Sequence, residues 1–330
     1  MITTEPATLS LMFKNAQPGG TFFVGSDFMY TYPKPIFTND QLIAKLISAG
    51  MIISDVEAAK SVLHSIGYYR LKGYCFDKYD NHTKKFRSGT SFSDIVRLYN
   101  FDSELSHIIF NFLSKIEVAL RTRVVESLSI HNDALVLNDP SVFDDKELFW
   151  KNNSTISSEI ARSNDVFIKH NFKKYNGAIP VWATVEVMSF GTLSKVVKNL
   201  KTGTKSSYSV LARNYRFLSA KGNSVAPSKD MLSSWIQSVS ILRNICAHNS
   251  RIYNRTINTA PQILHADTLA PKPSHNGLYQ VLLAMKYLRS SDTEWNSFVH
   301  SLKKLIDDYS DIVDISSLNF PSDWKDHFNI

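Results

Sequence analysis

Apolar residues recur at three- and four-residue steps along most of the chain, which is the spacing of one face of an α-helix. The longest such run starts at Ser93, and its apolar stripe is wide enough for a helix at the centre of the fold. A Thr38 or Asn39 cap predicts the start of the first helix, and Ser54 with Glu57 has the spacing of a capping box. Helices are expected at residues 39–49, 54–74, 93–128, 144–152, 154–172, 180–200, 205–218, 228–250, 275–289 and 291–309.

Strand patterns are nearly missing, since alternation of apolar and polar residues is nowhere sustained. Only residues 74–92 are suited to a small β-hairpin. The sequence therefore predicts an all-α helical bundle with additional N-terminal helices. Proline and glycine in QPGG and TYPKPIF make residues 1–37 an extended arm. Helical regions are expected at residues 38–140 and 141–330, with their junction near residues 133–145. The pattern fits either one domain or two.

The net charge and the composition say little about which kind of partner the protein binds. The chain has 37 Lys and Arg against 30 Asp and Glu, which gives a net charge of +7. This excess favours a polyanionic partner about as much as it favours a solvated basic surface. Two cysteines in apolar settings fit a reducing compartment, and neither a membrane span nor a signal peptide is evident, so a cytoplasmic protein without membrane contact is expected.

Metal and nucleotide motifs are missing from the sequence. The Cys and His spacing of a structural zinc site does not occur. Neither a GxxxxGK[ST] loop nor a GxGxxG turn is found. The sequence therefore predicts a protein with no metal site and no cofactor.

The stretch ILRNICAHNSRIYNR, residues 241–255, places polar residues where an otherwise apolar helix should end. Ser240, Asn244, His248 and Arg251 lie three or four residues apart, so they are expected on one polar stripe. Arg243 is expected on the flank between this stripe and the core. The spacing thus brings Arg243, Asn244 and His248 within a few ångströms of one another.

This trio suits phosphodiester cleavage without a metal ion. A histidine can take the proton of a ribose 2′-hydroxyl or give one to the leaving 5′-oxygen at neutral pH. An arginine stabilises the charge that develops on the phosphate, and an asparagine orients the imidazole or binds a phosphate oxygen. The structural alternative also stays open: a histidine at a helix end often caps carbonyls, and an arginine often pairs with a carboxylate.

Basic residues outside the trio are candidates for RNA contact. Lys195, Lys198 and Lys201 fall on one helix face, which would make a track for phosphates. Arg70 lies among tyrosines that could stack on bases, although an aromatic core corner explains that stretch equally well. Glu117 and Arg121 have the spacing of a surface salt bridge. The full set of candidate RNA-binding residues is Arg70, Lys72, Lys84, Lys85, Arg121, Arg123, Lys195, Lys198, Lys201, Arg251 and Arg255.

Four stretches together resemble the Abi-like abortive-infection family, the AbiD/AbiF group. They are IGYYRLKGY (66–74), LSKIEVALRTRV (113–124), PVWATVEVMSFGTLSKVV (180–197) and LRNICAHNSRIYNR (242–255). The resemblance runs from about residue 36 to residue 310, with the stretches in the family's order. Arg243 to His248 also matches the Arg-x4-His motif of HEPN-domain ribonucleases without a departure.

The resemblance implies a bacterial anti-phage protein with a HEPN-type fold and endoribonuclease potential. HEPN nucleases act as pairs, so a homodimer through the HEPN helices is implied, because this chain has one copy of the motif. Some members of the group associate with a small structured RNA that restrains the nuclease as an antitoxin restrains a toxin. The leading hypothesis is a metal-independent endoribonuclease that leaves 2′,3′-cyclic phosphates. The alternative is a non-cleaving RNA-binding scaffold of a phage-defence ribonucleoprotein.

Overall fold

The computed structural model describes residues 34–267 and 277–328, and this part of the chain is all-α, as expected. Its strands are limited to two short antiparallel hairpins, β1 (Tyr79–Asp80) with β2 (Lys85–Phe86) and β3 (Phe217–Leu218) with β4 (Ser224–Val225). The α-helices are α1 (Asn39–Ser48), α2 (Val56–Ile66), α3 (Tyr68–Lys72), α4 (Phe92–Leu128), α5 (Lys146–Arg162), α6 (Val166–Lys174), α7 (Val181–Val187), α8 (Phe190–Asn199), α9 (Ser207–Ala212), α10 (Lys229–Ala247), α11 (Leu278–Leu288), α12 (Asp292–Asp308) and α13 (Trp324–Phe328).

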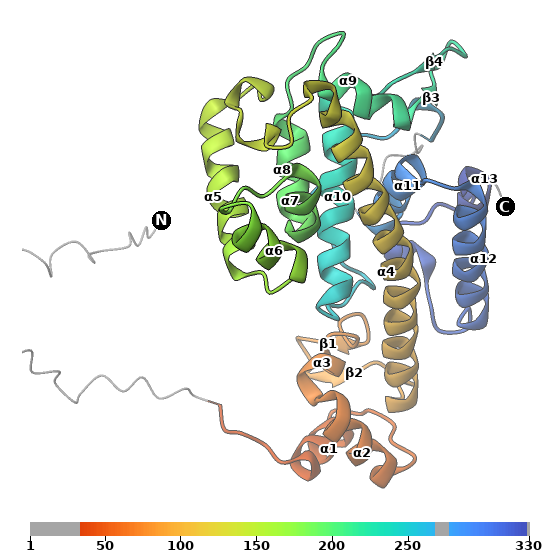
Figure 1. The fold of residues 1–330 in the computed structure, drawn as a ribbon. Helices are drawn as coiled ribbons and strands as arrows, with labels where there is room; N and C mark the ends of the chain where they lie inside the picture. Colours follow the sequence, from red (N-terminus) through yellow and green to blue (C-terminus); the bar gives the residue numbers. More distant parts are fainter. Residues whose placement is uncertain (1–33, 268–276, 329–330) are drawn as a thin grey trace, which may run out of the picture.

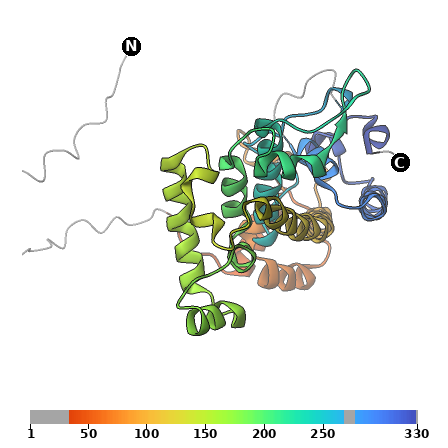
Figure 2. The ribbon, with the colours of Figure 1, turned by 45° about the horizontal axis from the view of Figure 1, so that its top comes forward.

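Helix α4 is the axis of the molecule. Its 37 residues make it about 55 Å long, and α10 and α12 pack along it. Helices α1 to α3 and the β1–β2 hairpin gather at the N-terminal end of α4, far from α9 at the other end (Figure 1). In both views α5 and α12 stand on opposite sides of the α4–α10 pair (Figure 2).

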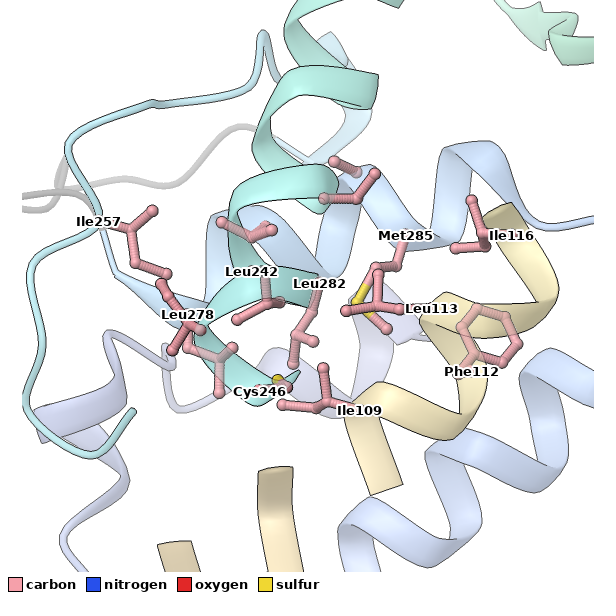
Figure 3. Close-up of a cluster of buried hydrophobic side chains, with 14 of the residues drawn as sticks. Ile109, Phe112, Leu113, Ile116, Leu242, Cys246, Ile257, Leu278, Leu282 and Met285 are labelled. Atoms are coloured by element: carbon pink, nitrogen blue, oxygen red, sulfur yellow. The ribbon is translucent and has the colours of Figure 1, made fainter. Parts of the chain in front are cut away.

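The core holds α10 between α4, α8 and α11. Ile109 and Leu113 of α4 face Leu242 of α10, and Leu282 of α11 closes the cluster (Figure 3). All four side chains are fully buried. Burial of a leucine or isoleucine side chain contributes roughly 1.5–3 kcal/mol, so this cluster fixes the direction of α10 strongly.

Several boundaries differ from the sequence prediction, and local hydrogen bonding explains them. The helix expected at 180–200 is two helices, because Ser189 is extended and its hydroxyl accepts from the Thr192 N–H to start α8. The two helices expected between residues 144 and 172 divide at residues 163–165 and not at 153. Helix α2 is capped by Asp55, whose carboxylate accepts from the Ala58 N–H, so the predicted Ser54–Glu57 box was wrong by one residue.

The hairpin expected within residues 74–92 is confirmed, with Tyr79 opposite Phe86. The β3–β4 hairpin was not expected, because residues 219–230 carry the composition of a connector. The N-terminal arm was expected over residues 1–37, of which 1–33 lie outside the described residues. Residues 35–37 contain neither helix nor strand, and the Ile36 side chain is exposed. The expected division near residue 140 stays a prediction.

Candidate active site at the end of helix α10

Helix α10 starts and stops through identifiable caps. The Ser228 hydroxyl accepts from the Met231 N–H, as the sequence predicted. At the other end the His248 N–H donates to the Asn244 carbonyl, and Asn249 then turns left-handed with φ of 48°. The helix is therefore shorter than the expected 228–250. Arg251 lies beyond it, so its expected place on the polar stripe of α10 was wrong.

The structure leaves the predicted catalytic trio accessible. Asn244 and His248 are exposed one helical turn apart, and the Arg243 side chain is 33% exposed. Arg243 Nη1 lies 3.5 Å from Asn244 Oδ1, at the limit of a hydrogen bond. Within the described residues the His248 imidazole has no hydrogen bond or ion pair. A histidine that capped carbonyls for structural reasons would show such a bond.

A buried carboxylate anchors one edge of the Arg243 guanidinium. Its Nε donates to Glu117 Oε2 at 3.1 Å, and its plane lies near the Phe110 ring, 5.8 Å from the centroid. An ion pair between Arg243 and a carboxylate is what the structural interpretation of this arginine expected. Since Nε is used and the side chain remains partly exposed, a second edge of the guanidinium can still reach a phosphate.

Glu117 belongs to a buried charge network that connects α4, α7 and α10. Its Oε1 accepts from Arg121 Nη2 at 2.5 Å, and both side chains are about 90% buried. Arg121 also donates to the carbonyls of Val185 and Met188 at the end of α7. The expectation of a surface salt bridge between Glu117 and Arg121 was therefore wrong. The buried Glu117 carboxylate is shared by two arginines, which compensates its loss of hydration.

Asp102 fixes the segment that follows His248. This buried carboxylate of α4 accepts from the backbone N–H groups of Ile252 and Tyr253, at 3.0 and 2.7 Å, and from the Tyr74 hydroxyl at 2.7 Å. Burial raises the pKa of Asp102 above its usual value and also raises the pKa of Tyr74. Asp102 thus ties the segment after α10 to α4 and to the end of α3.

Helix α3 and the residue that follows it also contact this segment. Arg70 Nη1 donates to the Asn249 carbonyl, and Arg251 Nη1 donates to the Gly73 carbonyl. The Arg251 guanidinium also lies over the Phe76 ring, 5.5 Å from its centroid. These contacts bring the sequence stretches 66–74 and 242–255 together.

The predicted RNA-binding residues fall into separate groups. Arg70 of α3 lies beside the end of α10, and so do Arg251 and Arg255 of the segment that follows it. Lys72 of α3 is exposed and lines a separate cavity between α1 and α3. Lys84 and Lys85 are exposed on the β1–β2 hairpin, and Lys195, Lys198 and Lys201 are exposed on or just after α8.

Two of the predicted RNA-binding arginines are engaged in contacts within the protein. Arg121 is occupied by Glu117 and by backbone carbonyls, which leaves it little capacity for RNA. The Arg123 guanidinium stacks on Tyr215, 4.8 Å from the ring centroid. RNA contact by the exposed residues stays a prediction.

Sequence reasoning did not foresee the roles of Asp102 and Glu117. A signal was present, because both acidic residues fall on the buried stripe of α4, among Leu105, Ile109, Leu113 and Leu120. An acidic residue on such a stripe requires a buried partner, since a lone buried carboxylate is very unfavourable. Neither partner is close in sequence: Arg243 is 126 residues from Glu117, and Ile252 is 150 residues from Asp102.

Two features are absent from the part of the chain that the structure describes. None of its helices combines the length and apolar character that crossing a bilayer requires. The same residues contain no group of three His, Cys, Asp or Glu side chains placed to hold a metal ion.

Comparison with known proteins gives one family. The model of the Abi-like protein family matches residues 61–254, which is more than half of the chain and includes α3, α4 and the whole of α10. No curated protein and no solved structure was found to match the chain.

Proposed function

The chain belongs to the Abi-like protein family, and from this premise we propose that it is a HEPN-type endoribonuclease of an abortive-infection system against phage. The observation that carries the proposal is the end of α10. There an exposed His248, which has no side-chain partner among the described residues, lies one turn from Asn244 and beside an Arg243 that is anchored by the buried Glu117. Residues of these types at this spacing suit RNA cleavage by the 2′-hydroxyl of the substrate.

In the proposed reaction the 2′-oxygen of the ribose attacks the adjacent phosphorus while its proton passes to a general base. The bond from phosphorus to the 5′-oxygen breaks, and this oxygen receives a proton from a general acid. The products are a 2′,3′-cyclic phosphate and a 5′-hydroxyl. His248 acts as acid or base, Arg243 stabilises the charge on the phosphoryl oxygens, and Asn244 orients the other two. None of these steps requires a metal ion.

One chain supplies a single histidine to this reaction, whereas the reaction needs both an acid and a base. We therefore propose that two copies of the chain form the complete site, with His248 of each copy in one role. Helices α4 and α10, which carry the network around Arg243, are the proposed dimer elements. Light scattering on the purified protein, with and without RNA, tests this assembly.

The proposal includes a small structured RNA that restrains the nuclease. Purification from the native locus followed by sequencing of extracted nucleic acid tests for it. A single discrete RNA in both the unmodified protein and an Arg243→Ala/His248→Ala variant supports a dedicated partner. A preparation free of RNA contradicts this part of the proposal and leaves the cleavage reaction untouched.

The functional experiment is induced expression in bacteria challenged with phage. The unmodified protein is expected to arrest growth or to lower the number of plaques, and His248→Ala is expected to abolish the effect at equal protein level. Protection that persists fully in His248→Ala would contradict a cleavage mechanism.

A non-cleaving RNA-binding scaffold is the second candidate. It is favoured by the exposed lysines 195, 198 and 201, which could hold phosphates without any chemistry. Expression that is harmless, with co-purifying RNA that stays intact, would support the scaffold over the enzyme.

A further inference from the structure

We propose that the cavity enclosed by α1, α3, the β1–β2 hairpin and the start of α4 binds one unstacked nucleotide of the RNA, with its base among aromatic side chains and its phosphate at Lys45 and Lys72. The inference deepens the proposed function, since it assigns a substrate-binding position next to the α10 site. It does not depend on cleavage.

The cavity has the size and lining of a small-ligand site. Its volume is about 310 Å³, at the lower end of the range for small-molecule pockets. The lining is mostly apolar, and its aromatic members are Tyr68, Phe76, Tyr79, Phe86 and Phe92. Tyr79 and Phe86 pack edge to face, with ring centroids 5.0 Å apart. A flat aromatic base suits such a lining better than a flexible chain does.

The charge of the lining selects an anionic ligand. In the described part of the chain, the charged residues that line the cavity are Lys45 and Lys72, and no carboxylate lines it. Both lysines are exposed, so their ammonium groups can reach a phosphate outside the cavity while a base occupies the interior. Asn81, which also lines the cavity, adds an amide that can donate to or accept from a base edge.

Helix α3 connects this cavity to the α10 site. Tyr68, Leu71 and Lys72 line the cavity on one side of the helix. On its other side Arg70 donates to the Asn249 carbonyl directly after His248. Phe76 is shared, because it lines the cavity and lies under the Arg251 guanidinium. A strand of RNA that crosses α3 can therefore place one base in the cavity and a nearby phosphate at Arg243 and His248.

Photocrosslinking tests the proposal directly. The full-length His248→Ala protein, which leaves the RNA intact, is irradiated with a 20-nucleotide single-stranded RNA that contains 4-thiouridine, and crosslinked peptides are mapped by mass spectrometry. We expect crosslinks to cavity-lining aromatic residues, Tyr68, Phe76 or Tyr79. Crosslinks confined to other parts of the chain would overturn the proposal.

A cavity-filling substitution gives the matched control. Ala49 is half-buried at the cavity, so Ala49→Phe occupies its interior, whereas Ala44→Phe adds the same ring to the exposed face of α1. Loss of one stacked base weakens RNA binding by roughly tenfold, so Ala49→Phe should bind about tenfold more weakly, and Ala44→Phe should bind as the parent does. Equal affinity of all three proteins would overturn the proposal. Should Ala49→Phe fail to fold, Lys72→Ala serves in its place, with an expected decrease of about 0.7 in the salt slope of binding.

Free nucleotides distinguish the source of the ligand. AMP, GMP, CMP and UMP at millimolar concentration should compete weakly with the crosslinks in the cavity. Tight binding of one mononucleotide without any RNA crosslink in the cavity would overturn the RNA assignment. If the protein crosslinks in the cavity but never cuts RNA, the proposed endoribonuclease function is ruled out and the nucleotide site stands. If the protein cuts RNA but shows no crosslinks in the cavity, the nucleotide site is ruled out and the endoribonuclease function stands.

Discussion

Glu117 and Arg243 are 126 residues apart in the sequence, and their side chains meet at 3.1 Å between Oε2 and Nε. Glu117 is buried and Arg243 is partly exposed, so the pair joins the interior of α4 to the accessible end of α10. The second Glu117 oxygen is held by Arg121, which is itself bound to the carbonyls at the end of α7. Three helices thus determine the direction of one guanidinium.

Replacement of Glu117 by glutamine should reduce RNA cleavage by about 10- to 100-fold, because a displacement of about 1 Å in a reacting group can cost that much. The amide still accepts one hydrogen bond, so the fold should persist, as checked by circular dichroism. Glu126→Gln, an exposed position on the same helix, is the matched control. Cleavage at the parent rate in Glu117→Gln would show that the anchor of Arg243 is irrelevant.

Asp102→Asn should lower the free energy of unfolding by about 1–3 kcal/mol. An asparagine offers one carbonyl oxygen in place of the carboxylate that accepts from Ile252, Tyr253 and Tyr74, so at least one buried donor loses its partner. Urea unfolding of this variant and of Asp307→Asn, an exposed control, measures the difference. Hydrogen exchange at Ile252 and Tyr253 should rise as well. Unchanged stability and exchange would contradict the role given to Asp102.

Both cysteines should resist alkylation in the native protein. Burial raises the pKa of Cys75 and of Cys246 to about 11, so at pH 8 only about one thiol in a thousand is ionised. The labelling rate should increase about tenfold for each pH unit up to pH 11, since the thiolate is the reacting form. Both should react at once in 6 M guanidinium chloride. Fast labelling of the native protein at pH 8 would contradict this burial.

The lysines at 195, 198 and 201 should contribute to RNA affinity mainly through charge. Replacement of all three by alanine should weaken binding at low salt and reduce the salt slope by about 2, because each contact to a single-stranded phosphate contributes about 0.7. A control variant with the same change of charge replaces three lysines of α12 and α13 by alanine, namely Lys303, Lys304 and Lys325. Equal salt slopes for the two triple variants would remove lysines 195, 198 and 201 from the RNA surface.

The sequence predicted the architecture well where periodicity carries the information. The wide stripe of α4 and the cap at Ser228 both appear as expected, since each depends on contacts within one helix. Helix ends at Ser189 and His248 were missed, because a single hydroxyl or a left-handed asparagine decides them. The proximity of Arg243, Asn244 and His248 was predicted from their spacing and is confirmed, whereas their catalytic role stays a prediction.

The support of that trio could not be predicted from spacing. The contacts Glu117–Arg243, Asp102–Ile252 and Arg70–Asn249 all join segments more than 100 residues apart, and the packing of α3 and α10 against α4 brings them together. Acidic residues on a buried stripe indicate that such partners exist. They do not indicate which residues the partners are.

Cleavage of RNA by the purified protein is the measurement that decides whether the chain is an endoribonuclease. The unmodified protein and His248→Ala are incubated with a labelled single-stranded RNA in the presence of EDTA, and the product ends are identified. We expect 2′,3′-cyclic phosphate ends from the unmodified protein and a rate at least about 100-fold lower for His248→Ala. Equal rates for the two proteins, or cleavage that requires a divalent metal ion, would contradict this expectation.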